Sequence, residues 1–276
     1  MESKSIRTVP LLAVGTRTLG FAWFFYFILS FFFVGAPLGI TVCLGTLLIS
    51  LVFPRTRSLS DAVLRRSIAI WMAFQPWLAF ESRAFDETYD ALLSTLGPDR
   101  KTGVLLVSNH RSHLDMFLVL SRVPGLRALA KRGLFAVPVL GLLMWMSRQI
   151  PVRRKNLRSF IGAMDTIEDR LARGEIIQVF PEMTRAEPDF PGVAEFNPAP
   201  FLVAMKTGAP ILPFVIHGTG EAWPKGSYAI RAGVSVRLEP LPVLRSDEFA
   251  GFDGAKALAE HVRARIDAAY RRGARV

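Results

Sequence analysis

The stretch V-L-L-V-S-N-H-R-S-H-L-D, residues 104–115, decides the fold of this chain. Its first four residues are aliphatic, and a short run of this kind is typical of a strand buried on both faces. Polar residues follow at once, and Ser112 is placed to serve as the N-cap of a helix over residues 114–121. A buried strand that leads through a polar turn into a helix is the repeating unit of α/β proteins.

The same alternation continues on either side of this stretch. Further strands are expected at 149–152, 176–180 and 211–216, with a β-hairpin through 228–238. Further helices are expected at 139–147, 157–173, 199–207 and 253–272. No internal repeat or low-complexity linker interrupts residues 58–276, so one domain is expected there. The predicted fold class is α/β, with a mostly buried mixed sheet flanked by helices.

The composition limits the kinds of protein that this chain can be. Of its 276 residues 51% are hydrophobic, which is far more than disordered chains contain. The 34 basic and 23 acidic residues give a net charge of +11, and 27 of the basic residues are Arg. Anionic partners are therefore expected, and guanidinium groups favour forked contacts with phosphate or carboxylate oxygens. The single cysteine, Cys43, excludes an intrachain disulfide and a Cys-x-x-Cys motif.

An apolar segment occupies the beginning of the chain. No charged residue lies between Arg17 and Arg55, and the segment contains the aromatic run L-G-F-A-W-F-F-Y-F-I-L-S-F-F-F-V. Such a segment belongs in or on a membrane. Helix breakers at 35–39 divide it into Leu19–Val34 and Leu38–Phe53, each about 24 Å long as a helix at roughly 1.5 Å per residue. Residues 1–57 are therefore predicted to form a tight, membrane-anchoring helical hairpin.

The flanks of the apolar segment indicate its orientation. Basic residues on both sides place both flanks in the cytoplasm. A signal peptide is the alternative, although its apolar region is only about 7 to 15 residues long. The following stretch, 60–80, has the pattern of an amphipathic helix bent near Pro76. Two interpretations of its tryptophans stay open, because Trp71 and Trp77 either lie at the headgroup level of a membrane or pack on the main domain.

The polar turn after residue 107 carries a pair of residues suited to acid–base chemistry. If His110 lies in the turn and Asp115 in the first helical turn, the carboxylate reaches an imidazole nitrogen. It then fixes the tautomer and leaves the other nitrogen free as a base. A metal hydrolase with His110, His113 and Asp115 as ligands is a second hypothesis. Their spacing, however, matches no helical H-x-x-x-H pair.

Two further strand ends are candidates for a site. The stretch I-I-Q-V-F-P-E-M-T-R, residues 176–185, ends a strand at a proline and continues with Glu182, Thr184 and Arg185. The mouths of such strands are common ligand sites. The stretch P-I-L-P-F-V-I-H, residues 210–217, is interpreted as a buried edge strand, because proline is confined largely to the edges of sheets.

Taken together, these blocks resemble the glycerolipid acyltransferases. Residues 109–115 match N-H-x-S-x-x-D, and residues 180–185 nearly match F-P-E-G-T-R. I-P-V-R-R, residues 150–154, stands where that family has a strand ending in Arg, and residues 210–216 resemble its proline-containing fourth block. The chain is most similar to the 1-acyl-sn-glycerol-3-phosphate acyltransferase family, over about residues 100–218. Four blocks in this order argue against coincidence.

The resemblance implies a membrane-bound enzyme at the cytoplasmic face of a bacterial inner membrane. It implies transfer of an acyl group from acyl-CoA or acyl carrier protein to the hydroxyl of a lysolipid, in the first place from 1-acylglycerol-3-phosphate to phosphatidic acid. No metal, cofactor or nucleic acid is expected. The implied site residues are the catalytic pair His110 and Asp115, the acceptor-binding Arg154, Glu182, Thr184 and Arg185, and the supporting Asn109, Ser112 and Pro213.

The chain departs from the family pattern at two places. Met183 stands where F-P-E-G-T-R has Gly, and residues 196–200 lack the basic residue and the Gly expected there. If the backbone at Met183 needs a positive φ, this side chain is strained. Another acceptor, such as lyso-ornithine lipid or a different lysolipid, therefore stays open.

A hypothesis from another class is a non-enzymatic, membrane-tethered binder of anionic lipid. It would use the basic C-terminal residues and leave the motifs above unexplained. These residues are Arg263, Arg265, Arg271, Arg272 and Arg275.

Overall fold

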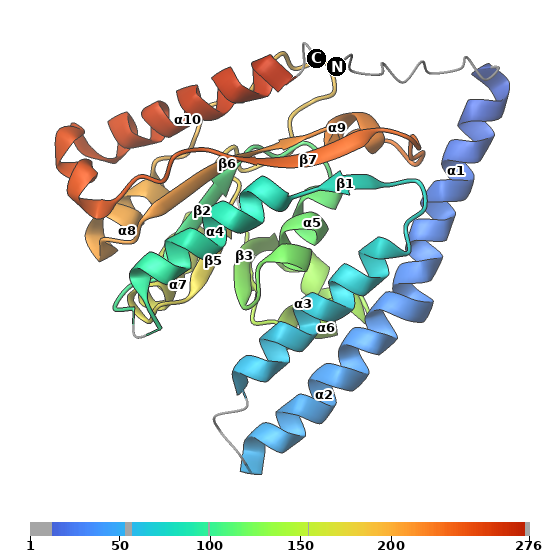
Figure 1. Cartoon of the computed structure of the whole chain (residues 1–276), viewed down its shortest axis with the longest axis horizontal. Coiled ribbons are helices and arrows are strands. Elements are labelled where there is room, and N and C mark those ends of the chain that lie inside the picture. Colours follow the sequence, from blue (N-terminus) through green and yellow to red (C-terminus); the bar gives the residue numbers. More distant parts are fainter. Residues whose placement is uncertain (1–12, 53–56, 99, 154, 274–276) are drawn as a thin grey trace.

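One mixed sheet forms the centre of the computed structural model, which describes residues 13–52, 57–98, 100–153 and 155–273 (Figure 1). The strand order is β1-β7-β6-β2-β5-β3-β4, with β6 and β7 antiparallel and the other neighbours parallel. The strands are β1 (Ala79–Glu81), β2 (Val104–Ser108), β3 (Leu126–Lys131), β4 (Ile150–Val152), β5 (Ile176–Val179), β6 (Ile211–His217) and β7 (Ser235–Pro240). The predicted α/β fold with a mixed sheet is confirmed.

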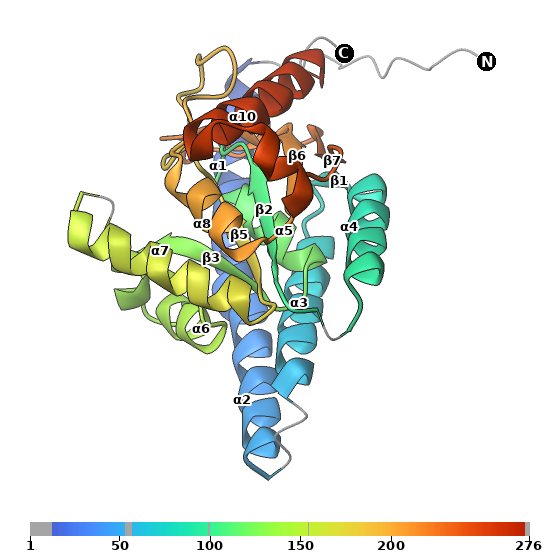
Figure 2. The same ribbon diagram turned by 90° about the vertical axis from the view of Figure 1, so that its left-hand side faces the viewer.

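Helices cover both faces of this sheet. The side chains of β2 alternate, so that Leu105 and Val107 join the apolar layer on one face and Val104 and Leu106 the layer on the other. The first layer is completed by α7 (Leu157–Ala172), α8 (Ala199–Thr207) and α10 (Gly254–Gly273), and the second by α4 (Arg83–Leu96) and α5 (Leu114–Arg122). Figure 2 shows α7 and α4 on opposite sides of the strands.

Two predictions for the sheet were wrong. No β-hairpin spans 228–238, because β7 begins at Ser235 and pairs with β6 on one side and β1 on the other. The strand that contains Pro213 is not at an edge, since β6 lies between β7 and β2. Proline removes only a donor, and the Pro213 carbonyl still accepts a hydrogen bond from the Leu241 N–H at 2.9 Å. A central strand therefore tolerates it here.

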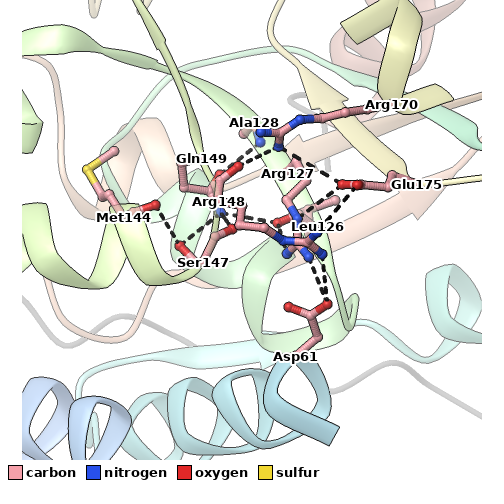
Figure 3. Close-up of polar contacts among 10 residues, drawn as sticks. All are labelled: Asp61, Leu126, Arg127, Ala128, Met144, Ser147, Arg148, Gln149, Arg170 and Glu175. Carbon is pink, nitrogen blue, oxygen red and sulfur yellow. Dashed lines mark hydrogen bonds and ion pairs between the residues drawn. The ribbon is translucent and has the colours of Figure 1, made fainter. Parts of the chain in front are cut away.

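The sequence patterns missed β1, α4 and the interior strand β3. The sequence of β3 is L-R-A-L-A-K, and Arg127 breaks its apolar pattern although its side chain is only 2% exposed. Asp61 of α3 (Arg57–Ala73) neutralises the guanidinium at 2.7 Å, and Glu175 does so at 3.3 Å (Figure 3). A buried charge needs such partners. They come from distant parts of the chain, so a local pattern does not reveal them.

The ion-pair cluster around Arg127 fastens α3 to the sheet. Arg148 lies 3.6 Å from Asp61 and 3.6 Å from Glu175, and Arg170 of α7 lies 4.0 Å from Glu175. Arg127 is at the beginning of β3, and Glu175 directly precedes β5. The cluster therefore lies at the amino ends of these strands. Figure 3 shows its ion pairs together with the neighbouring polar contacts.

The apolar segment does not fold back at residues 35–39. Helix α1 (Ala13–Ser30), a π-helical turn (Phe31–Gly35) and α2 (Ala36–Val52) form one continuous helix along one side of the domain (Figure 1). The hairpin predicted within residues 1–57 was therefore wrong at this point. In the π-turn the Ala36 N–H bonds to the Phe31 carbonyl, five residues back, and such a turn accommodates Pro37, which has no N–H.

Glycine in this helix serves packing. A Cβ built on Gly35 would lie 2.8 Å from the Trp71 ring, so the absence of a side chain lets α3 approach. Trp71 and Trp77 are only 1% and 2% exposed. The interpretation that these two tryptophans pack on the main domain is therefore correct, and the interpretation that they lie at the headgroup level of a membrane is wrong. Helix α3 ends at Ala73, so it is not bent at Pro76.

Candidate active site

The candidate site lies where β2 and its two neighbours, β5 and β6, end. These three strands are parallel, so their carboxyl ends meet at one edge of the sheet. Asn109, directly after β2, joins two of them: its side-chain amide donates to the Ile216 carbonyl at 2.9 Å and accepts from the Ile216 N–H at 2.8 Å. Buried and fully engaged, Asn109 holds the turn in register with β6.

His110 and Asp115 are in direct contact, as their spacing predicted. The His110 Nδ1 lies 2.8 Å from Asp115 Oδ2. The same oxygen accepts the backbone N–H groups of Arg111 at 2.7 Å and Ser112 at 2.9 Å. The Asp115 side chain is fully buried, whereas the His110 side chain is 14% exposed. A carboxylate bound to Nδ1 fixes the tautomer that leaves Nε2 unprotonated.

Residues after β5 hold His110 from a second side. The Phe180 ring stacks on the imidazole with a centroid distance of 4.1 Å and an angle of 16°. Glu182 accepts the backbone N–H of His110 at 2.8 Å and that of Ala194 at 3.0 Å. Burial raises the pKa of Glu182, and these two hydrogen bonds oppose the rise. Glu182 therefore positions the turn that carries His110. Phe180 is part of the sequence motif, but the motif did not indicate that its ring stacks on His110.

Arg185 supplies a positive charge near this pair. Burial lowers the pKa of Arg185, while Asp115 and Glu187 act in the opposite direction, so the group stays charged at neutral pH. Its own carbonyl accepts a hydrogen bond from Lys225 at 3.0 Å, which ties the segment to the loop after α9 (Thr219–Ala222). Thr184, beside it, is exposed.

Met183 has a φ of 59°, in the left-handed region. Its N–H donates to the Phe180 carbonyl at 3.0 Å, which closes a tight turn after β5. A residue with a Cβ is disfavoured in this conformation. The sequence predicted backbone strain at Met183 if its φ is positive, and this strain is therefore present.

The remaining predicted site residues have supporting positions. The Ser112 hydroxyl donates to the Trp223 carbonyl at 2.8 Å and accepts from the Leu114 N–H at 3.3 Å, although the N-cap position of α5 is His113. Pro213 lies opposite Val107 of β2, inside the sheet. Arg154, predicted to bind the acceptor's phosphate, lies outside the described residues.

Arg111 is a buried residue of the site that sequence reasoning missed. Its side chain donates to three backbone carbonyls, those of Glu187 at 3.2 Å, Phe190 at 3.0 Å and Gly192. The guanidinium carbon also lies 4.6 Å from the centre of the Tyr270 ring of α10. Arg111 therefore joins the turn that carries His110 to residues 187–192. A charged residue between two motif positions gives no local signal for this role.

The other histidines have different surroundings. The His113 ring lies 5.4 Å from the Trp223 ring, and desolvation together with the nearby Arg185 and His110 lowers the pKa of His113 to about 4. His217 contacts Glu239 at 2.8 Å and is structural, and His261 is exposed. In the described ranges no three His, Cys, Asp or Glu side chains gather to hold a metal ion.

The basic C-terminal helix is largely neutralised on its own surface. Arg263 pairs with Glu260, and Arg271 pairs with Asp267 at 2.7 Å. Arg265 donates to the Pro242 carbonyl. Arg275 lies outside the described residues. Most of the basic residues near the C-terminus therefore have partners of the kind found on an ordinary solvent-exposed helix.

Comparison with known proteins defines the class of this domain. Residues 92–217 match the Acyltransferase family model, so they form an acyltransferase domain. The chain is 33% identical to the chloroplastic 1-acyl-sn-glycerol-3-phosphate acyltransferase BAT2 of Brassica napus over 141 residues, which are 51% of this chain and 40% of that protein. It is 26% identical to the 1-acyl-sn-glycerol-3-phosphate acyltransferase of Salmonella typhimurium over 165 residues, 59% of this chain and 65% of that protein.

A solved structure shares the fold. The crystal structure of PlsC, the 1-acyl-sn-glycerophosphate acyltransferase from Thermotoga maritima, superimposes with a TM-score of 0.70 at 21% identity and covers 95% of this chain and 96% of that one. The solved structure shows that the fold is shared, and the similar proteins are 1-acyl-sn-glycerol-3-phosphate acyltransferases, the family that the motifs predicted.

Proposed function

We propose that this protein transfers an acyl group from a thioester donor, acyl-CoA or acyl carrier protein, to the free hydroxyl of 1-acylglycerol-3-phosphate, giving phosphatidic acid. The observation that carries the proposal is the 2.8 Å contact between His110 Nδ1 and the buried Asp115 carboxylate at the strand ends. The names of the similar acyltransferases support the same substrate class.

The chemistry follows from the free imidazole nitrogen. His110 Nε2 takes the proton of the acceptor hydroxyl as its oxygen attacks the thioester carbon, and Asp115 stabilises the resulting imidazolium. The tetrahedral intermediate then loses the thiolate, which receives the proton from His110. The result is an ester and a free thiol, with no acyl-enzyme. The N–H groups of Arg111 and Ser112 are bound to Asp115, so the oxyanion uses other donors.

Acceptor binding is assigned to Arg185, with Arg154 as a second phosphate ligand. A guanidinium that is half-buried beside the catalytic pair, and that forms no ion pair within the described residues, suits a phosphate monoester. Glu182 acts through the backbone of His110, so its role is positioning.

The apolar helix lies directly beside the site, which suits an acceptor that stays in the membrane. The 23 residues Leu19–Thr41 are long and apolar enough to cross a membrane. On this helix, Phe27 lies 5.3 Å from the Trp223 ring and 5.8 Å from the Phe117 ring of α5. Phe33 and Phe25 are 75% and 60% exposed. We place the enzyme at the cytoplasmic face of a membrane, where the lysolipid reaches the site without lifting its chain into water, at about 0.8 kcal/mol per CH₂.

The test is an acyl-transfer assay on the detergent-purified chain, with labelled acyl-CoA or acyl carrier protein and lysophosphatidic acid. His110→Ala and Asp115→Asn are expected to lower turnover by about 10³-fold or more, because the base or its tautomer is lost. Arg185→Ala should mainly raise the acceptor KM. His261→Ala, an exposed histidine on α10, is the matched control and should keep full turnover. Full activity of His110→Ala would refute the mechanism.

A second acceptor is favoured by one observation, the strained Met183. Its side chain occupies a position where the family motif has no side chain. The assay therefore includes lyso-ornithine lipid and other lysolipids. Acylation of one of these in place of lysophosphatidic acid would keep the chemistry and change the acceptor.

A further inference from the structure

A basic hollow lies at the carboxyl ends of β3 and β4, on the same edge of the sheet as the site. It has a volume of about 320 Å³ and is lined by Arg132, Arg153, Asn156, Arg158 and Ser159. The ion pairs within the described residues involve other arginines. Asn156 and Ser159 are bound to each other as the N-cap of α7. The three guanidinium groups of the hollow therefore have their charge available to a ligand.

The surrounding chain contains no local counter-charge. Residues 116–164 include nine basic residues and no Asp or Glu. Of the nine, Arg122, Arg127 and Arg148 pair with acids from other parts of the chain. The uncompensated charge is thus concentrated at residues 131–132 and 153–158, around the hollow. Such a concentration attracts an anionic surface.

Exposed apolar side chains lie on the elements that adjoin the hollow, namely the turn after β3, α6 and the beginning of α7. Trp145 of α6 (Leu140–Met146) and Leu157 at the beginning of α7 are each 73% exposed. Smaller exposures are found for Ile161 at 50%, Leu142 at 44% and Leu134 at 38%. Apolar and aromatic groups beside cationic ones are the combination found at membrane interfaces. Large apolar side chains that are this exposed usually mark a surface that contacts a partner or a membrane.

This surface is continuous with the apolar helix. Helix α6 packs on α2, where a Cβ built on Gly39 would lie 3.3 Å from Leu143. The 3₁₀ turn that follows β3, Arg132–Ala136, contacts both α6 and β4. In Figure 2, α6 lies next to α2, and α7 extends on the same side of the molecule. A path of exposed apolar and basic groups therefore leads from the apolar helix to the hollow.

We propose that this surface, the interfacial belt, is a second membrane contact that binds a bilayer containing anionic lipid, with a headgroup phosphate in the hollow. The belt comprises the exposed apolar residues Leu134, Leu142, Trp145, Leu157 and Ile161 together with Arg132, Arg153 and Arg158 of the hollow. A single helix leaves a domain free to tilt about it, whereas two contacts fix its orientation. The hollow lies at the carboxyl ends of β3 and β4, the same edge as the catalytic pair, so docking there turns the strand-end site toward the headgroups. From the hollow the belt extends along α6 to Trp145, beside the amino end of β4. The inference does not require the acyl-transfer reaction.

The experiment measures docking of the belt separately from insertion of the apolar helix. The full chain carries Cys43→Ser and a single environment-sensitive fluorophore at Leu157→Cys, and is reconstituted into vesicles. One set is pure phosphatidylcholine and the other contains 30 mol% phosphatidylglycerol. A fluorophore at Lys101→Cys, exposed before the amino end of β2, is the control position. Doxyl-labelled lipid quenches only a probe at the bilayer.

The expected result is quenching at position 157 that increases with anionic lipid, and none at position 101. Each basic contact is worth about 1 kcal/mol near an anionic surface, roughly fivefold in the docking equilibrium. Arg132→Gln, Arg153→Gln and Arg158→Gln together should lower that equilibrium at least tenfold. The charge-matched set Arg83→Gln, Lys101→Gln and Lys256→Gln, at exposed positions with the probe at 157, should leave it unchanged.

Three results would overturn the proposal. The first is a probe at 157 that stays in water on anionic vesicles while the protein cosediments with them through its apolar helix. The second is quenching that the arginine substitutions do not reduce. The third is arginine variants that dock normally and instead raise the KM for the acyl donor, which would assign the hollow to the donor's phosphates. Loss of turnover through His110→Ala does not affect the first two readouts, which measure quenching and not turnover.

Discussion

Replacing Met183 tests whether its backbone is strained. Met183 has a φ of 59°, which costs an L-residue roughly 1–2 kcal/mol. Glycine has no such cost, but its freedom in the unfolded chain costs roughly 0.5–1 kcal/mol relative to alanine. Met183→Gly and Met183→Ala both lose the side chain and differ only in the Cβ. Met183→Gly should therefore be the more stable of the two by about 0.5–1 kcal/mol, which is roughly 1–4 °C in Tm for a domain of this size.

The assay is thermal unfolding of both variants in one detergent, followed by circular dichroism. Asp189 is the control position, since it is an exposed residue of the same segment with an ordinary φ. There Asp189→Ala should be at least as stable as Asp189→Gly. If Met183→Ala equals or exceeds Met183→Gly, the left-handed conformation is not what the chain adopts. In that case Met183 also gives no reason to expect a different acceptor.

Three further predictions concern residues outside the catalytic pair. Asp61→Asn should lower the free energy of unfolding by about 1–3 kcal/mol in a urea titration, because it leaves the buried Arg127 with one acidic partner fewer. The control is Asp169→Asn, which removes an exposed ion pair and should change the free energy of unfolding by less than about 0.5 kcal/mol. The folded pKa of His113, about 4, lies below its unfolded value, so the unfolded chain binds the extra proton and stability is lost as pH falls from 6.5 toward 4. The urea midpoint of His113→Gln should therefore decrease less than that of the unchanged protein between pH 7 and pH 5, and equal decreases would contradict the assigned pKa. Arg111→Met should raise the acceptor KM more than it lowers kcat, because it removes the hydrogen bonds that hold residues 187–192 near Arg185. Limited proteolysis should then cleave residues 187–192 faster than in the unchanged protein. An unchanged cleavage rate would contradict the role of Arg111.

Sequence patterns predicted the site better than they predicted the sheet. The five-residue spacing of His110 and Asp115 places both at one helix N-terminus, so the contact between them is local and was predicted correctly. Strand β3 was missed because Arg127 is buried by acids that are distant in the chain. Pro213 was assigned to an edge because the rule for proline does not take account of the strands that lie on either side.

The apolar segment illustrates the same limit. The residues at 35–39 have low helix propensity, and on that basis a turn is expected. The helix continues because Gly35 lets Trp71 of α3 approach and because a π-turn accommodates Pro37. Propensity is a weak preference that packing overrides.

The sequence by itself determined the α/β class, the apolar beginning of the chain and the pairing of His110 with Asp115, because each depends on residues within a few positions of one another. The tertiary structure alone decided that Arg127 is buried, that Arg111 binds residues 187–192, and that the interfacial belt adjoins the apolar helix. These features depend on which distant segments meet. That choice is made by the free energy of the whole packed chain, which no short window of sequence contains.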